Sequence, residues 1–232
     1  MASRLDALCV LARDPEWLAR FWAAALGREA VTDGDSLLLA AAPPEIRLRF
    51  REGDVPKEGG NQVHLHLTST SLSHQAEVVR RLLDLGARHL DVGQLPEETH
   101  VVLADPEGNE LCVIGPGNTF LEGCGFLAEV ACDGTAAVGR FWSAALGWPL
   151  VWDQDEETAI QSPLGGPKIA WGGPPLTAPT RRMRFELSVA GDEAAEVERL
   201  VSLGASVVSS GGGGAPYVLA DPDGVVLHLL TG

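Results

Sequence analysis

The sequence is poor in basic residues, and this scarcity argues against one large class of partner. Its 232 residues include 17 Lys and Arg against 32 Asp and Glu, which gives a formal net charge of −15. Nucleic-acid phosphates are bound by clustered lysines and arginines, and neither half of the chain has a basic excess. We therefore expect no nucleic-acid partner, and the acidity favours solubility.

Long apolar runs and paired cysteines are also missing. No stretch reaches the roughly 18 apolar residues that cross a bilayer, and the N-terminus lacks the pattern of an export signal. The only cysteines are Cys9, Cys112, Cys124 and Cys132, with no CxxC pair. This usage favours reduced thiols over a disulfide framework, so we expect a cytoplasmic protein with no membrane partner.

What the sequence does contain is an internal repeat of three segments. RFWAAALG at 20–27 returns as RFWSAALG at 140–147, LLDLGA at 82–87 as LVSLGA at 200–205, and VVLADPEGNEL at 101–111 as YVLADPDGVVL at 217–227. Three similar segments in the same order indicate a duplicated domain. The Gly/Pro/Asn stretch at 115–118 predicts the boundary, which gives domains at residues 1–116 and 120–232.

Each domain is predicted to contain two modules of one strand, one helix and three further strands. Asp14-Pro15 begins the first helix, because Asp is a good N-cap and Pro is tolerated in the first turn. A glycine after leucine ends each of the four helices, at Gly27, Gly86, Gly147 and Gly204. The fold class is α+β, with βαβββ modules at about residues 1–58, 60–115, 121–175 and 180–232.

Three motifs carry a family resemblance: the FW-x-x-x-LG helix, the HLHL strand ahead of a helix ending in LGA, and DPEGNE. They resemble the vicinal oxygen chelate superfamily, which includes glyoxalase I, bleomycin-resistance proteins and extradiol dioxygenases. The resemblance implies two tandem glyoxalase-like domains with curled mixed sheets, helices on the outside and one pocket per half. Such folds support both enzymes and non-catalytic binders, so it leaves open whether the protein is an enzyme.

The metal-dependent relatives place His or Glu on inward-facing strand positions. Carried onto this chain, those positions fall on Ala7, about Arg49, His64 and Cys112, and on Phe126, about Ala170 or Trp171, Arg184 and His228. Arginine has no lone pair to offer a cation. The resemblance therefore implies an incomplete metal site in each half.

Strand alternation predicts which side chains face the clefts. The apolar residues of VHLHL mark the core side, which leaves His64 and His66 facing inward, and Glu110 shares a face with Cys112. Glu129 has the opposite parity to Phe126, so a bulge or an edge position is expected there. Structural alternatives stay open: a solvated face for the arginines, cross-strand bonding for His64, and core packing for Cys112 and His228.

A metal-free interpretation uses the same positions. Arg47, Arg49 and Arg184 would bind an anionic oxygen through planar guanidinium groups, and His64 or His228 would donate or accept a proton. Aromatic side chains would contact a ring, or would simply pack in the sheet: Trp148, Trp152 and Trp171. The predicted ligand-binding set is completed by His66, Glu110 and Glu186.

The sequence thus favours a glyoxalase-like, resistance-type protein that binds a small aromatic or anionic molecule without an obligatory metal or cofactor. The alternative is a metal-dependent lyase, isomerase or ring-cleaving dioxygenase, with one Zn, Fe or Mn ion held by His64, His66, Glu110 and Cys112. A third hypothesis makes the second half a packing scaffold without a working site. A monomer is feasible because the two halves can pair as two subunits would, and a homodimer is the alternative.

Overall fold

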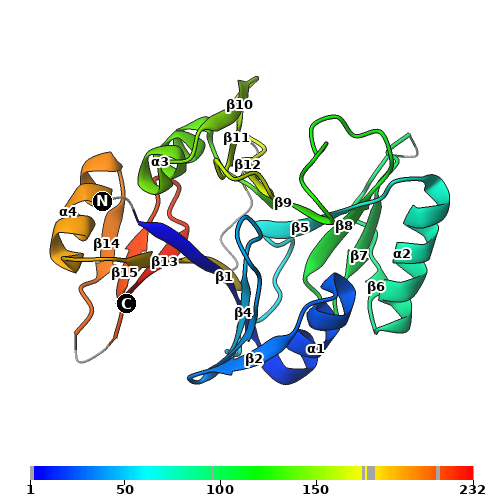
Figure 1. The fold of residues 1–232 in the computed structure, drawn as a ribbon, viewed down its shortest axis with the longest axis horizontal. Coiled ribbons are helices and arrows are strands. Elements are labelled where there is room, and N and C mark those ends of the chain that lie inside the picture. The colour runs from blue at the N-terminus through cyan, green and yellow to red at the C-terminus, as the bar shows by residue number, and fades with distance from the viewer. Residues whose placement is uncertain (1–2, 96, 174–175, 177–180, 213–214, 232) are drawn as a thin grey trace.

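The chain forms four βαβββ modules, as the repeat predicts (Figure 1). The computed structural model describes residues 3–95, 97–173, 176, 181–212 and 215–231, so the predicted module ends at 174–175, 180 and 232 lie outside the described residues. The first half contains β1 (Arg4–Ala12), α1 (Pro15–Leu26), β2 (Ala30–Asp33), β3 (Ser36–Leu39), β4 (Leu48–Glu52), β5 (Val63–Thr68), α2 (Leu72–Asp84), β6 (Arg88–His89), β7 (Val101–Ala104) and β8 (Glu110–Ile114). The second half contains β9 (Leu127–Cys132), α3 (Ala136–Leu146), β10 (Leu150–Gln154), β11 (Glu157–Gln161), β12 (Lys168–Trp171), β13 (Met183–Val189), α4 (Glu193–Leu203), β14 (Ser206–Ser209), β15 (Tyr217–Ala220) and β16 (Val226–Thr231).

The predicted helix signals are confirmed at both ends of α1. The Asp14 side chain accepts a hydrogen bond from the backbone N–H of Trp17 at 2.8 Å. Gly27 ends the helix with φ 65°, and its repeat Gly147 ends α3 with φ 68°. These left-handed conformations carry no Cβ penalty in glycine, which explains why the four Leu-Gly pairs terminate the four helices.

The two Asp-Pro turns are also confirmed. Gly108 N–H donates to the carbonyl of Asp105, and Gly224 N–H donates to that of Asp221, each at 2.9 Å. This bond between first and fourth residues is the signature of a β-turn. The turns join β7 to β8 and β15 to β16.

The strands form two eight-stranded mixed sheets, and each sheet combines modules from both halves of the chain. The first sheet has the order β14-β15-β16-β13-β1-β4-β3-β2, and the second has the order β10-β11-β12-β9-β5-β8-β7-β6. β1 pairs antiparallel with β13, and β5 pairs antiparallel with β9. In Figure 1, β1 at the blue end of the colour scale lies beside β13, which is drawn in gold.

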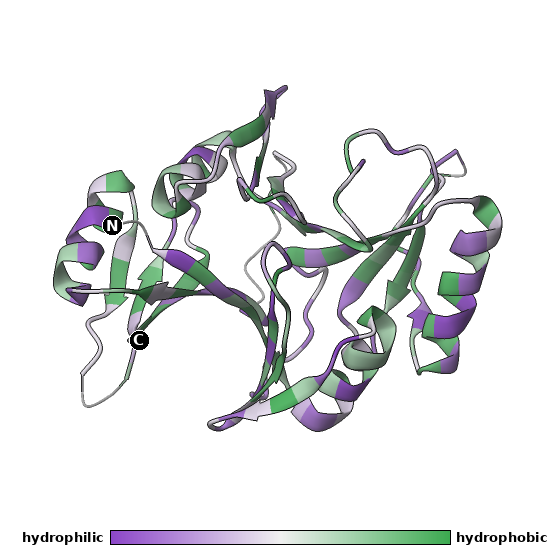
Figure 2. Cartoon of the chain, in the orientation of Figure 1, coloured by the Kyte–Doolittle hydropathy of each residue, from purple (hydrophilic) through white to green (hydrophobic). Residues whose placement is uncertain are grey.

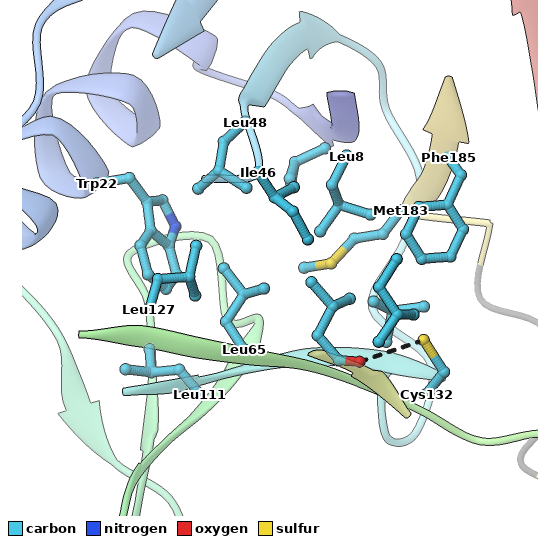
Figure 3. Close-up of a cluster of buried hydrophobic side chains, with 14 of the residues drawn as sticks. Leu8, Trp22, Ile46, Leu48, Leu65, Leu111, Leu127, Cys132, Met183 and Phe185 are labelled. Atoms are coloured by element: carbon cyan, nitrogen blue, oxygen red, sulfur yellow. Dashed lines mark hydrogen bonds between the residues drawn. The ribbon is translucent and has the colours of Figure 1, made fainter. Parts of the chain in front are cut away.

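The apolar faces of both sheets share one core with the helices. Figure 3 shows Leu8 and Phe185 of the first sheet in the same cluster as Leu65 and Leu127 of the second, with Trp22 of α1. The expected core residues of the repeated helix are buried: Phe21, Trp22, Phe141, Trp142 and Leu146. Leu26 is partly buried against the same core. Figure 2 shows hydrophobic and hydrophilic residues alternating along α2, as expected for a helix with one buried face.

The described residues contain neither a disulfide nor a membrane-spanning helix. All four cysteines are buried and unpaired. No helix in the described part of the chain combines the length and the apolarity needed to span a bilayer.

Candidate functional site

The polar faces of the two sheets carry two separate cavities. The arginine cleft, on the first sheet, has a volume of about 650 Å³ and is lined by residues that include Asp6, Arg49, Arg51, Arg184, Glu186 and His228. The histidine cleft, on the second sheet, has a volume of about 410 Å³ and is lined by residues that include His64, His66, Phe120, Glu129, Trp152 and Ala170. Each cleft takes residues from both halves, so the expectation of one pocket within each half is wrong. The reason is that β1 pairs with β13 and β5 pairs with β9.

The histidine cleft contains a row of three functional side chains across three neighbouring strands. His66 on β5 lies opposite Glu129 on β9 and opposite Cys112 on β8. Glu129 Oε2 lies 2.5 Å from His66 Nδ1. The pairing shifts by one residue between His66 and Leu67, so that Ala128 is the extra residue of a β-bulge. The bulge lets Leu127 and Val130 both face the core while Glu129 faces the cleft.

Burial and neighbouring charges set opposite proton states for the two histidines. Burial lowers the pKa of His66, but its contacts with Cys112 and Glu129 outweigh this and raise the pKa to about 9. For His64, burial and then the nearby His66 and His100 lower the pKa to about 3. The rings are 4.8 Å apart between centroids. At neutral pH the cleft thus holds one imidazolium paired with Glu129 and one neutral imidazole beside it.

His64, His66 and Cys112 are close enough to bind one metal ion. Their ligand atoms lie within 4.8 Å of one another. Two imidazoles and a thiol are donors that suit zinc or iron, so this set fits the metal implied by the resemblance. Glu129 contacts His66 and is the nearest carboxylate in the row.

Glu110 lies outside that group, although it belongs to the predicted metal set. Its Oε1 is 2.6 Å from Lys57 Nζ, and its Oε2 accepts from the backbone N–H of Asn61 at 3.1 Å. Both oxygens of the Glu110 carboxylate therefore contact the loop that precedes β5. The structure brings together three of the four residues of the predicted set.

Aromatic side chains line the histidine cleft beside this polar row. Phe120 and Trp152 pack edge to face with centroids 5.8 Å apart, and Lys168 Nζ lies 4.2 Å from the centroid of Phe120. Trp171 also lines the cavity but is only 2% exposed. Trp148 lines a different cavity with Arg47. The structure thus brings two of the three predicted tryptophans to this cleft, with only Trp152 substantially exposed.

The arginine cleft is built around one buried carboxylate. Glu186 is 1% exposed, and its Oε2 accepts from Arg49 Nη1 at 2.7 Å. Arg51 Nε and Arg184 Nη2 each lie 3.6 Å from Glu186 Oε1. Three guanidinium groups therefore surround one carboxylate, and two of them are beyond hydrogen-bond distance of it.

Asp residues of β1 and of the turn between β2 and β3 complete this network. Arg49 Nη2 contacts Asp6 Oδ2 at 3.0 Å and Asp33 Oδ2 at 2.8 Å. Arg51 pairs with Asp35, and Arg47 pairs with Asp6. None of the three aspartates is among the residues predicted from the sequence. The turn sequence Asp33-Gly34-Asp35, close to the alternating arginines, was the available signal.

His228 faces the arginine cleft from β16, opposite Glu186 of β13. Burial lowers its pKa to about 4, and the charges of Arg184 and Arg51 act in the same direction. Its imidazole is therefore neutral at pH 7 and adds no positive charge to the cleft.

The two clefts differ at one pair of equivalent strand positions. Ala170 on β12 pairs with Ala131 on β9, and the corresponding pair in the first sheet is Arg49 on β4 with Cys9 on β1. The arginine cleft therefore has a guanidinium-bearing side chain at the position where the histidine cleft has only a methyl group.

The arrangement of four modules in two sheets is matched by known proteins. The sequence profile of the glyoxalase-like domain matches residues 7–114 and again residues 128–230. The chain belongs to the glyoxalase-like domain family. This places it in the vicinal oxygen chelate superfamily, as the repeat motifs predict, with two pseudo-symmetric halves in one chain.

Solved structures show the same fold over nearly the whole length of this glyoxalase-like protein. Glyoxalase I from Zea mays is 14% identical, covers 99% of this chain and 92% of its own, and gives a TM-score of 0.66. Its V278E variant is 13% identical with the same coverage and a TM-score of 0.67. A candidate dioxygenase from Bacillus subtilis subsp. subtilis strain 168 is 12% identical, covers 99% and 85%, and gives 0.59. No curated protein sequence matches the chain.

Proposed function

We propose that the histidine cleft binds a small, ring-bearing organic molecule, and that the protein acts by binding and sequestration without an obligatory metal. The observation that carries this proposal is the juxtaposition of the Phe120 and Trp152 rings with the polar row of His66 and Glu129. Ligand sites are apolar cavities with a few placed polar groups that fix orientation. A cavity of about 410 Å³ with this lining has those features.

Trp152 and His64 suggest how such a ligand would be oriented in the cleft. Its ring would stack or pack edge-on against Trp152, which is 37% exposed. A polar substituent would reach the neutral imidazole of His64, which can donate or accept a proton. The arginine cleft has no comparable aromatic wall, because its described lining residues contain no Phe, Tyr or Trp.

The test is titration of metal-free protein with phenol, benzoate and benzamidine, which share a ring but differ in charge. Binding should raise the melting temperature increasingly with ligand concentration and quench the part of the tryptophan fluorescence that Trp152 contributes. Trp152→Ala should weaken binding at least about tenfold, because ring contacts are lost. Trp17→Ala is the matched control, since Trp17 is 44% exposed and outside the cleft. Equal binding by both variants would refute the assignment of this cleft.

A metal-dependent enzyme of the lyase, isomerase or dioxygenase type is the second candidate, supported by the closeness of His64, His66 and Cys112. A divalent ion held there would act as a Lewis acid toward a ligand oxygen. Protein purified without chelators should then contain about one zinc, iron or manganese per chain, lost in His64→Ala but retained in His89→Ala, which changes an exposed histidine on β6. Metal below one tenth per chain in the unaltered protein would refute this candidate.

We further propose that the protein is cytoplasmic and monomeric. Four buried, unpaired cysteines support a cytoplasmic protein. A monomer is sufficient because each cleft is complete within one chain, and a homodimer is the alternative that a sedimentation measurement separates from it.

A further inference from the structure

We propose that the arginine cleft is a second ligand site, which takes a small dianion in place of the carboxylates of Asp33 and Asp35. The occupant is defined by two negative charges on oxygen, as in a phosphate group or a dicarboxylate. The proposal concerns the first sheet and does not depend on what the histidine cleft binds.

The inner part of the cleft is permanently assembled. Arg49 is 5% exposed and Glu186 is 1% exposed, and they are joined by a 2.7 Å hydrogen bond. Asp6, on the bulge of β1, pairs with both Arg47 and Arg49. These groups cannot separate without leaving a buried charge uncompensated, which is strongly unfavourable.

The outer part of the cleft is different, because its carboxylates are exposed. Asp33 and Asp35 lie at the turn between β2 and β3, and their side chains are 49% and 84% exposed. The side chains of Arg49 and Arg51 are only 6% and 25% exposed, but Arg49 keeps Asp6 and Glu186 as partners and Arg51 stays 3.6 Å from Glu186. The carboxylates of Asp33 and Asp35 can therefore move into water while both arginines remain close to a buried carboxylate.

When Asp33 and Asp35 move away, the positive charges around the cleft outnumber the negative ones. Arg49, Arg51 and Arg184 line the cleft, and Arg47 of the neighbouring cavity shares Asp6 with Arg49. This connected network of four guanidinium groups then keeps only the carboxylates of Asp6 and Glu186. The network has two positive charges in excess, inside a protein whose formal net charge is −15. Asp33 and Asp35 thus occupy the place of an external dianion.

Guanidinium N–H groups without hydrogen-bond partners also favour an anionic ligand in this cleft. Within the described residues, the Nε atoms of Arg49, Arg51 and Arg184 are buried without a hydrogen-bond partner. The nearest carboxylate oxygen to the Arg184 guanidinium, on Glu186, is 3.6 Å away. Buried polar groups without partners are unfavourable, and guanidinium groups bind carboxylate and phosphate oxygens in a planar, two-pronged geometry. The Arg184 guanidinium lines a cavity of about 650 Å³, which can admit such a group.

The experiment titrates inorganic phosphate and succinate, at constant ionic strength, into the full chain and the Asp33→Asn/Asp35→Asn variant. We expect the variant to bind at least one of the two dianions at least about tenfold more tightly than the unaltered protein, since the internal competitors are gone. Preference for phosphate or for succinate identifies which class of dianion fits. Adding Arg51→Gln and Arg184→Gln to the variant should reverse the gain.

A charge-matched control neutralises two aspartates elsewhere. Asp84→Asn/Asp153→Asn removes the partners of Arg80 and Arg140, which are exposed ion pairs outside the cleft. This control should bind both probes as the unaltered protein does. The dianion should also raise the melting temperature of the Asp33→Asn/Asp35→Asn variant more than that of the control, which shows binding even where the variant is less stable. No binding of either probe by the variant, or an equal gain in the control, would overturn the proposal.

Discussion

Trp22 and Asp105 are joined by a buried hydrogen bond between a helix and a turn of neighbouring modules. Trp22 Nε1 on α1 donates to Asp105 Oδ2 at 3.2 Å, and the repeat reproduces it, because Trp142 Nε1 on α3 donates to Asp221 Oδ2 at 3.2 Å. These bonds lie within each half, whereas the sheets join modules of opposite halves. The RFW and ADP segments are thus repeated together because each supplies one partner of the same contact.

Loss of the indole N–H should destabilise the protein although the aromatic packing is largely kept. Asp105 is fully buried, so Trp22→Phe leaves one of its oxygens with a lost hydrogen bond, at a cost of about 1–3 kcal/mol. Urea unfolding measures this change, and Trp142→Phe should have a similar effect. Trp17→Phe, on the exposed face of α1, should change stability by less than about 0.5 kcal/mol. Equal effects at Trp17 and Trp22 would contradict the role assigned to the bond.

Asp221 should make the folded state less stable as the pH rises from about 4 to about 6. Burial raises its pKa from 3.8 to about 6, although hydrogen bonds from Trp142, Val225 and Asp223 act against this. Between these values the unfolded chain loses this proton and the folded protein retains it, so the free energy of unfolding falls with increasing pH. Above about pH 6 the effect is complete.

The comparison with Asp221→Asn isolates this group from the other carboxylates. The stability of the unaltered protein minus that of the variant should decrease from pH 4 to pH 6 and then remain constant. Urea unfolding at four pH values measures it. Asp223→Asn is a poor control because Asp223 bonds Thr135, so Asp155→Asn, at the exposed turn between β10 and β11, is preferable. A difference that stays flat over this range would show that the Asp221 carboxyl is not perturbed.

Gly139 on α3 should not tolerate alanine, although alanine favours helices. A Cβ at this position would lie 1.9 Å from Thr158 Oγ1 and 2.5 Å from Thr158 Cβ. We expect Gly139→Ala to destabilise the protein by about 1–3 kcal/mol, measured by thermal or urea unfolding. Thr158→Ala in the same chain should restore part of the loss, because it removes the closer atom. The exposed Ala144→Gly calibrates the backbone effect at about 1 kcal/mol. No loss in Gly139→Ala would mean that α3 packs less closely on β11.

Removal of the buried carboxylate of the arginine cleft should be far more costly than removal of an exposed one. Glu186→Gln leaves three guanidinium groups without their shared anion, and we expect a loss of about 3–5 kcal/mol. Asp153→Asn breaks an exposed pair with Arg140, in which the side chains are 41% and 56% exposed, and should cost about 0–1 kcal/mol. Urea unfolding compares the two. Similar costs would show that Glu186 is not the centre of the network.

The inward orientation of His64 and His66 was predictable, because three apolar residues alternate with them along one strand. The position of Glu129 was predictable only in part. The parity of β9 required an irregularity, but its partner and its place in the cleft depended on the pairing of β9 with β5, which are about 60 residues apart in the chain.

The aspartates of the arginine cleft show the same limit. Alternation placed the arginines of β4 on one face, but no local pattern showed that Asp6 and Asp33 would neutralise them. Their contacts arise from the order of strands in the first sheet, in which β1 lies beside β4. Whether a guanidinium is free or paired is decided by such neighbours.

By itself the sequence determined the four modules, their helix ends and turns, the buried face of each strand and the family. These are local properties, since capping, turn geometry and alternation depend on residues a few positions apart. Only the tertiary structure decided that each cleft is shared between the two halves. Similar modules offer similar strand edges, so the repeat alone does not specify which edges pair, and long-range packing selects β1 with β13 and β5 with β9.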